Sequence, residues 1–460
     1  MGDPFGDFPG SKSLDQPLVA TVCCASPSDV GEAVAAAKAA LEFDFPSHER
    51  YEVLMRAAAL VEGQKDDYAR DIALEGSKTI REARGEPLRV AAILRLSAEE
   101  GRRSAGQTLP FDSRVGSENR IGYYFRFPVG VVGAITPFND PLTTAAHKIA
   151  PALAAGNAVV LKPATATPLS ALHLGRNLME AGLPPGCLNI VPGSGEIVGE
   201  ALACDPRVRA LSFTGGVETG ERITRVAGIK KLLMELGSNS PVIVLPDADL
   251  ERAVPAIAAG AFAQAGQNCL GVQRVLLHKN VYEAFADRFV NHVSRLKAGS
   301  SLDETTDVCA MINQKQAERI DSWIQEAVAR GARVLAGGRR EGALVWPTIL
   351  EWVPDGVRLD CEEAYGPVVS LYRVASLDEA IERANRVNYG LHAAIFTESL
   401  RDAFKAVRCL EVGAVIVNDS TDYRLDVMPF GGTKMSGIGR EGMRFALEAF
   451  TETRVVCLNL

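Results

Sequence analysis

Hydrophobic residues from position 129 onward follow a regular alternation. Short apolar runs rich in Val, Leu and Ile alternate with Ala-rich stretches of helical character. This alternation is typical of βαβ units, in which a mostly parallel sheet carries helices on both faces. The strands expected in this region are 129–136, 158–161, 188–191, 210–213 and 232–235. The expected helices are 142–155, 168–182, 196–203 and 217–228.

The alternation repeats after Gly237, near which we place a domain boundary. The second set of strands is 242–245, 274–278, 367–372, 393–396 and 414–418. The second set of helices lies near 248–264, 280–297, 313–330, 377–386 and 399–409. Two consecutive α/β units fit a chain of 460 residues better than one sheet does.

The N-terminal quarter is mainly helical in pattern. Ser26 is a suitable N-cap, with a proline in the first turn and Asp29 where a capping-box acid belongs. Further helix is expected across about 47–75 and 77–105. The segment 107–127 breaks the pattern, and the C-terminal 453–460 alternates like a strand with no neighbour in sequence. Such strands often pair with each other or across a subunit interface.

Charge and composition exclude several classes of protein. The formal net charge of -8 argues against electrostatic binding of nucleic acid or anionic membranes. No apolar run is long enough for a transmembrane helix, and the first residues lack the basic and apolar regions of a secretory signal. Nine irregularly spaced cysteines are typical of reduced intracellular thiols. We therefore expect a cytoplasmic protein of enzyme size.

One cysteine stands out from the other eight. Cys269 follows Gly266-Gln267-Asn268 in a loop between an expected helix and an expected strand. The glycines around it, Gly266 and Gly271, suit close approach of the backbone to a ligand. Cys269 is therefore a candidate nucleophile. The alternative interpretation is a small buried hydrophobic residue.

Three further polar residues follow expected strands directly. Glu235 and Lys162 end apolar strands, and Asn139 lies in a proline-bounded loop after another. Side chains at strand ends in α/β domains tend to face the ligand crevice. The alternatives are solvated charges for Glu235 and Lys162 and a turn former for Asn139. Two glycine-bearing turns, 193–199 and 215–220, each precede a helix whose N-terminus can hold a pyrophosphate.

Taken together and in this order, the motifs resemble the aldehyde dehydrogenase superfamily over essentially the whole chain. They are PFN at 137–139, LKPA at 161–164, PGSG at 192–195, FTGG at 213–216, MELGS at 234–238, GQNC at 266–269, EEAYGP at 362–367 and PFGGTKMSGIGREG at 429–442. The resemblance implies an α/β fold with two Rossmann-like parallel-sheet domains and a small β oligomerisation element. The implied parts are a cofactor-binding domain of 1–107 and 128–236, a catalytic domain of 237–445, and an oligomerisation element of 108–127 and 446–460. A homodimer or homotetramer is also implied.

The resemblance assigns the chemistry to three residues. Cys269 would attack the aldehyde carbon as a thiolate. The side-chain amide of Asn139 and the backbone N–H of Cys269 would hold the resulting oxyanion. Glu235 would activate the water that hydrolyses the thioester formed after oxidation.

The resemblance also implies an NAD or NADP site and no metal. Its residues would be Thr136, Phe138, Lys162, Ala164, Thr165, Gly195, Gly215, Gly216, Leu236, Glu363 and Tyr365. Lys162 and Glu363 resemble the family's ribose ligands. Thr165 stands where the family usually has an acid, which leaves Lys162 free to pair with a 2′-phosphate, so NADP is slightly favoured.

Two arginines bear on the substrate. Arg103 and Arg424 resemble residues of the lactaldehyde, phosphonoacetaldehyde and non-phosphorylating glyceraldehyde-3-phosphate dehydrogenases. Two guanidinium groups suit a phosphate, phosphonate or carboxylate, so we expect a small anionic aldehyde. The alternatives are surface arginines with a neutral aldehyde as substrate, a CoA-acylating semialdehyde dehydrogenase, or a catalytically idle binding protein. His147, on the helix after Asn139, is expected to be a helix-packing residue.

Overall fold

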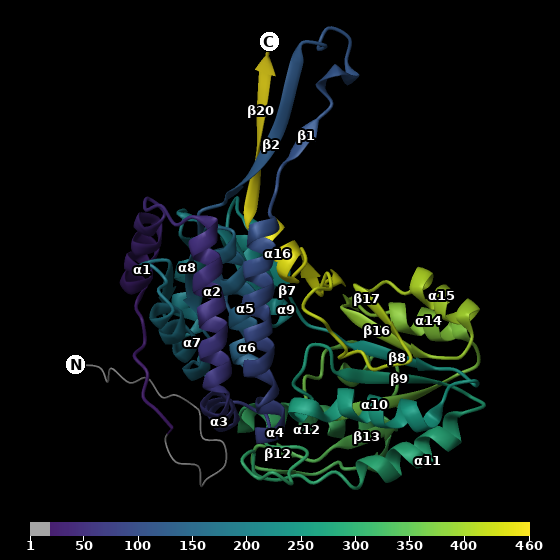
Figure 1. The fold of residues 1–460 in the computed structure, drawn as a ribbon. Helices are drawn as coiled ribbons and strands as arrows, with labels where there is room; N and C mark the ends of the chain where they lie inside the picture. Colours follow the sequence, from purple (N-terminus) through teal and green to yellow (C-terminus); the bar gives the residue numbers. More distant parts are fainter. Residues whose placement is uncertain (1–18) are drawn as a thin grey trace.

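Two sheets with helices on both sides organise the chain, and a narrow β arm extends from the first of them (Figure 1). The computed structural model describes residues 19–460. The N-terminal segment 1–18, on which the expected absence of a secretory signal rests, lies outside the described residues.

The first sheet has the order β19-β7-β6-β3-β4-β5. Its five parallel strands are β3 (Val131–Ile135), β4 (Ala158–Lys162), β5 (Leu188–Ile190), β6 (Val208–Thr214) and β7 (Lys231–Glu235). All five confirm predicted strands. The short β19 (Gly437–Ile438) pairs antiparallel with β7. This part of the predicted catalytic domain therefore completes the first sheet.

The second sheet has the order β10-β13-β14-β9-β8-β16-β17. Five strands were predicted: β8 (Ser240–Val244), β9 (Val272–His278), β14 (Val368–Val374), β16 (His392–Phe396) and β17 (Ala414–Val417). The sequence did not predict β10 (Arg333–Ala336) or β13 (Thr348–Glu351), each of four residues. The two strands pair antiparallel with no helix between them, so they fall outside the alternation of strands and helices on which the prediction rests. The two parallel-rich sheets are consistent with two Rossmann-like domains.

Helices of the N-terminal quarter cover the first sheet. Ser26 caps α1 (Pro27–Ala40) in the predicted capping box with Asp29. The two long helices expected next are each interrupted, giving α2 (Ser47–Gly63) and α3 (Lys65–Glu75), then α4 (Ile80–Ala83) and α5 (Gly85–Arg103). The apolar faces of α2 and α5 share one core with α6 (Pro141–Ala154) and α16 (Met443–Ala449).

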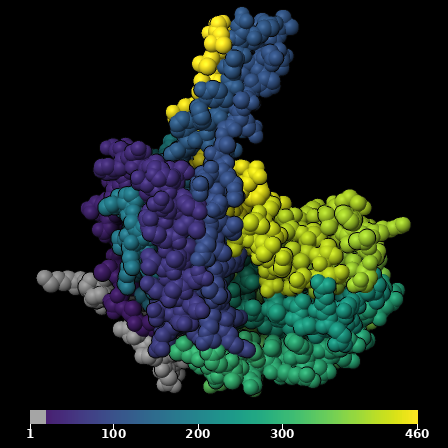
Figure 2. Space-filling model, viewed as in Figure 1, coloured from purple at the N-terminus to yellow at the C-terminus, as the bar shows by residue number. Residues whose placement is uncertain are grey.

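The arm is a three-stranded antiparallel sheet, β1 (Gln107–Leu109), β2 (Arg120–Pro128) and β20 (Thr451–Asn459). The register runs from Arg120 opposite Asn459 to Pro128 opposite Thr451, which confirms the predicted pairing of the two segments. The arm stands clear of the body (Figures 1 and 2). The predicted element is too long at one end, because 446–449 belong to α16 in the core of the first domain.

In the part of the chain from residue 19 onward, no helix is long and apolar enough to cross a membrane.

Candidate active site

Cys269 lies in a turn that joins α10 (Leu250–Phe262) to β9. Gln264, Ala265 and Gly266 all have positive φ, at 55°, 52° and 68°. A Cβ at Gly266 would collide with the carbonyl of Gly366, so the glycine is required there. The half-buried Cys269 then packs against Leu270, Leu391 and Phe430.

The surroundings of Cys269 favour a neutral thiol. Burial raises the pKa of the thiol, and the charge of Asp140 raises it further. Glu363 and Glu235 act in the same direction, and Arg424 opposes them. These interactions show that both domains, and four ionisable side chains, come together around the candidate nucleophile.

Glu235 is the last residue of β7 and is buried. Its Oε2 has no hydrogen-bond partner among residues 19–460. Burial raises its pKa well above the usual range, and the nearby charge of Glu441 adds to the shift. A Cβ on Gly431 would lie 2.7 Å from Oε1, so that glycine leaves room for the carboxylate. An unpartnered carboxyl group with a raised pKa is suited to a general base.

Asn139 is buried in the loop between β3 and α6. Its Nδ2 donates to Asp140 Oδ2 at 3.0 Å. The amide has a second N–H, which no protein oxygen takes within the described part of the chain. The loop that carries Asn139 is tied to the next strand, because the N–H of Thr136 donates to Lys162 O at 3.2 Å.

Lys162 ends β4 and is buried without a carboxylate partner in the described residues. Its Nζ donates to the carbonyl of Pro163 at 2.8 Å, and burial lowers its pKa to about 8. Thr165 is turned to another group, since its Oγ1 donates to Gly193 O at 3.0 Å. Lys162 is therefore a buried cation with no anion paired to it among the described residues. A phosphate group of a dinucleotide would supply that anion.

The predicted glycines lie at helix N-termini. Gly195 begins η2 (Gly195–Gly199), and Gly216 is the N-cap of α9 (Val217–Val226). A Cβ at either position would meet nothing within 4 Å, so both are open to a ligand. Gly215 differs, because a Cβ there would collide with the ring of Phe213.

The other predicted cofactor residues come from both domains. Glu363 Oε1 accepts from the N–H of Ser238 at 2.8 Å, and burial raises its pKa to about 7. Tyr365 has a φ of 48° and meets the ring of Phe138 edge-on, with the centroids 5.8 Å apart. Of the remaining predicted residues, Ala164 lies two residues after the end of β4, and Leu236 follows β7 directly. The carboxyl ends of parallel strands are where α/β sheets bind their ligands.

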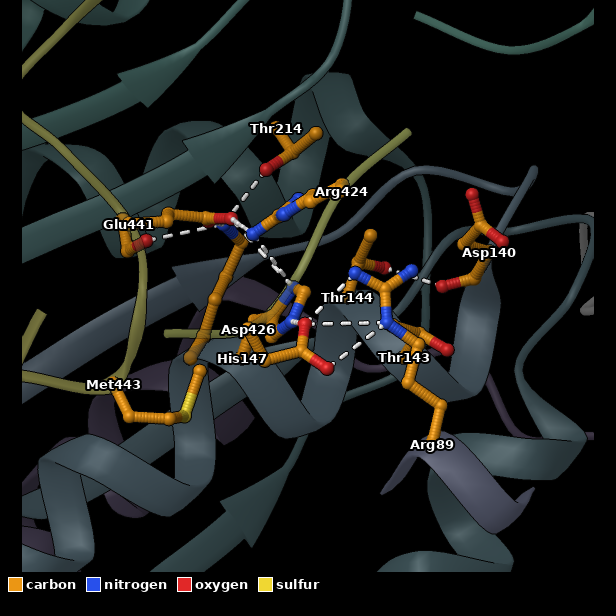
Figure 3. Close-up of polar contacts among 12 residues, drawn as sticks. Arg89, Asp140, Thr143, Thr144, His147, Thr214, Arg424, Asp426, Glu441 and Met443 are labelled. Carbon is orange, nitrogen blue, oxygen red and sulfur yellow. Dashed lines mark hydrogen bonds and ion pairs between the residues drawn. The ribbon is translucent and has the colours of Figure 1, made fainter. Parts of the chain in front are cut away.

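A buried polar cluster between α6 and the C-terminal loops was not predicted (Figure 3). Lys148 Nζ donates to Glu441 Oε1 at 2.9 Å and to Thr214 Oγ1 at 2.7 Å. His147 Nε2 lies 2.9 Å from Asp426 Oδ1. His147 is fully buried on α6, as expected for a helix-packing residue, and it also takes part in this polar cluster, where burial lowers its pKa to about 4 and keeps it neutral.

Arg424 has poor partners for a buried cation. Its Nη2 lies 3.3 Å from Glu441 Oε2 and 3.4 Å from His147 Nδ1, and its Nε has no partner among the described residues. The guanidinium lies 3.5 Å above the ring of Phe430, which also contacts Cys269. Arg424 can therefore still offer donors to an anion beside the thiol.

The structure does not bring Arg103 to this site. Arg103 is the last residue of α5, its side chain is 63% exposed, and it pairs with Glu99 and Glu100 at 3.1 Å each. Arg89, about 21 Å back along the same helix, reaches the cluster instead and contacts Asp426 at 2.7 Å. Arg103 therefore forms a surface ion pair, and no contact in the described part of the chain supports its predicted role toward the substrate. Sequence offered no signal for Arg89, because its partner lies 337 residues away.

Nothing in the site resembles a metal centre. Among residues 19–460, no group of three or more His, Cys, Asp or Glu side chains is arranged to hold a metal ion.

Comparison with known proteins agrees with this arrangement. The model of the aldehyde dehydrogenase family matches residues 8–456. The chain is 46% identical over 450 residues to 3-sulfolactaldehyde dehydrogenase of Priestia aryabhattai, covering 98% of this chain and 94% of that protein. It is 46% identical over 453 residues to aspartate-semialdehyde dehydrogenase 1 of Pseudomonas canavaninivorans, covering 97% and 95%.

A solved structure agrees in fold as well. The glyceraldehyde-3-phosphate dehydrogenase GapN of Methanocaldococcus jannaschii, complexed with NADP, superposes with a TM-score of 0.93 at 37% identity. The match covers 96% of this chain and 97% of that chain. The motifs, the two sheets and these matches agree, and the chain belongs to the aldehyde dehydrogenase family, the enzymes that oxidise aldehydes with NAD or NADP.

Proposed function

We propose that this enzyme oxidises a small anionic aldehyde to its carboxylic acid, through a covalent intermediate on Cys269 and with NADP favoured over NAD. The observation that carries the substrate class is Arg424, whose side chain lies near the thiol, is only 10% exposed and has an Nε without a partner among residues 19–460. Three relatives support it, because 3-sulfolactaldehyde, aspartate semialdehyde and glyceraldehyde 3-phosphate each carry an anionic group besides the aldehyde.

The chain's own residues account for the covalent steps. The thiolate of Cys269 attacks the aldehyde carbon, and the carbonyl oxygen becomes an oxyanion held by the free N–H of Asn139 and the N–H of Cys269. When bound, the nicotinamide cofactor supplies the hydride acceptor, which leaves a thioester on Cys269. Glu235 then takes a proton from water, whose oxygen attacks the thioester and releases the acid and the thiol. The raised pKa of Glu235 makes it a stronger base than an exposed glutamate.

The cofactor preference rests on Lys162 and Thr165. Lys162 is a buried cation with no carboxylate partner among residues 19–460, and Thr165 stands where the family usually has an acid. A 2′-phosphate would supply the missing anion, and the GapN relative carries NADP. Glu363 would accept from the ribose on the nicotinamide side.

The experiment is an absorbance assay for reduced cofactor that crosses NAD and NADP with four aldehydes. The aldehydes carry a phosphate, a phosphonate, a carboxylate or no charge. We expect the anionic substrates to have the higher kcat/KM and NADP to be preferred. Equal kcat/KM for the neutral aldehyde would overturn the anion site. Acyl-CoA as the product when CoA is added would favour the acylating alternative.

We also propose that the enzyme is a cytoplasmic homodimer or homotetramer assembled through the arm. Ile121 and Phe125 of β2 and Val455 and Leu458 of β20 are exposed on a sheet with free edges. The nine irregularly spaced cysteines support a reducing compartment. Light scattering on a size-exclusion column tests the assembly, and a monomer would contradict it.

A further inference from the structure

Asp140 is a helix N-cap that does not cap its own helix. It precedes α6, yet its carboxylate accepts no backbone N–H of that helix. An N-cap aspartate usually accepts from the second or third residue. Here the N–H of Thr143 donates to Glu86 Oε2 at 2.9 Å, and Glu86 comes from α5. The carboxylate of Asp140 is therefore available to other donors.

Three side chains donate to that carboxylate. Lys78 Nζ and Gln264 Nε2 donate to Oδ1, the latter at 3.2 Å, and Asn139 Nδ2 donates to Oδ2. Lys78 also bonds Glu86 Oε1 at 2.6 Å. Burial opposes a charge on Asp140, but Lys78 holds its pKa below the usual value. Asp140 is therefore an anion, which can only accept.

An acceptor-only neighbour determines which way an amide faces. If the Asn139 amide were flipped, its carbonyl oxygen would meet Asp140 Oδ2 as one acceptor against another. The ionised carboxylate therefore keeps Nδ2 on its own side and takes one of the two N–H groups. The second N–H is left for a ligand.

The same carboxylate also reaches the turn that leads to Cys269. Three consecutive residues of that turn, 264–266, have positive φ, which is costly for Gln264 and Ala265. Gln264 is held twice from the first domain, by Glu82 Oε1 at its backbone N–H (2.8 Å) and by Asp140 at its side chain. One carboxylate thus joins the amide of one domain to the nucleophile turn of the other.

We infer that Asp140 is a positioning residue for aldehyde oxidation: it orients the Asn139 amide toward the oxyanion and, through Gln264, holds the turn that carries Cys269. The inference rests on the proposed role of Asn139 in the oxyanion site. The carboxylate of Asp140 also has an unfavourable effect on catalysis, because its negative charge near the sulfur disfavours the thiolate of Cys269. Loss of the charge should therefore damage catalysis and yet make the thiol more reactive.

Catalysis and thiol reactivity should therefore change in opposite directions. A residue with a purely structural role would not produce this combination. p-Nitrophenyl acetate acylates Cys269 and is hydrolysed without cofactor. In Asp140→Asn, we expect kcat for this hydrolysis to fall by about tenfold to a hundredfold. The alkylation of Cys269 by iodoacetamide, followed by peptide mass spectrometry, should become faster, and its pH profile should move to lower pH. The charged groups that face the thiol in that titration are Asp140, Arg424, Glu363 and Glu235. Those that face Asp140 are Lys78, Glu86 and Arg89.

Two further variants keep the inference falsifiable if Asp140→Asn folds poorly. Asp140→Glu keeps the charge but displaces the oxygens, so it should lower ester hydrolysis without speeding alkylation. Asp249→Asn is the matched control, since exposed Asp249 is an N-cap that does cap its helix, through the N–H of Glu251 at 3.0 Å. It should change neither rate.

The outcomes separate this inference from the proposed function. Normal ester hydrolysis in both Asp140 variants, with a loss in Asn139→Ala, would overturn the role of Asp140 alone. Normal hydrolysis in Asn139→Ala would overturn the oxyanion site itself. Slower alkylation together with slower hydrolysis in Asp140→Asn would assign Asp140 a structural role and also overturn the inference.

Discussion

Lys148 Nζ lies 2.9 Å from Glu441 Oε1, and both side chains are buried near Glu235 of the candidate active site. Burial opposes the charge on Glu441, but Lys148, with His147 and Arg424, holds its pKa at about 2. Glu441 is therefore ionised at any pH at which the enzyme is studied. Its fixed negative charge is one reason for the raised pKa of Glu235.

Replacing Glu441 by Gln should lower the pKa of Glu235. A carboxyl group with a raised pKa acts as a base only above that pKa, so activity is lost as pH falls through it. Without the repulsion from Glu441, the acidic limb of kcat should move to lower pH, by roughly one unit. The measurement is the pH profile of kcat for the best aldehyde. An acidic limb that stays in place or moves to higher pH would contradict the electrostatic coupling. Because Lys148 loses its partner, Tm should also fall.

Replacing Cys269 by Ser should abolish aldehyde oxidation and leave cofactor binding intact. The hydroxyl is a far weaker nucleophile at neutral pH than a thiol. The cofactor residues lie on other loops, so their geometry should be retained. Absorbance of the reduced cofactor measures turnover, and isothermal titration with NADP measures binding. Substantial residual turnover would disprove the assignment of the nucleophile.

Arg424 and Arg103 should behave differently when replaced by Ala. Loss of Arg424 should reduce kcat/KM for anionic aldehydes by about a hundredfold, because a charge-assisted hydrogen bond is worth roughly 1.5–3 kcal/mol. The neutral aldehyde should be affected much less. Arg103→Ala is the control, since that side chain is exposed and pairs only with neighbours on its own helix. Equal losses for charged and neutral substrates in Arg424→Ala would show that this arginine supports the fold rather than recognition.

Replacing Thr165 by Glu should move the cofactor preference toward NAD. A carboxylate at this position would pair with Lys162 and repel a 2′-phosphate. We expect KM for NADP to rise at least about fivefold, since like charges in contact cost about 1 kcal/mol or more. The ratio of kcat/KM for the two cofactors is the measurement. An unchanged ratio would mean that the phosphate does not lie near Lys162.

Much of the fold was predictable because its signals are local. The strands that alternate with helices, the capping box at Ser26 and the orphan strand at the C-terminus depend on neighbours within a few residues. β10 and β13 gave no such signal because no helix separates them, so they do not follow the alternation of strands and helices. The breaks at Gln64 and Arg84 are each a single residue between two helices, so the helical pattern of the sequence continues across them.

The sequence by itself determined the family, the two α/β units, the pairing of the arm and the motif residues at the ends of strands. Only the tertiary structure decided which charges meet around them. Arg89 meets Asp426, Lys148 meets Glu441, and Asp140 meets Gln264, across 337, 293 and 124 residues of chain. A helix such as α5 carries arginines on several turns, and the local sequence pattern does not show which of them lies at the site. That choice depends on how two separate domains pack, since a buried charge is stable only where packing brings its partner.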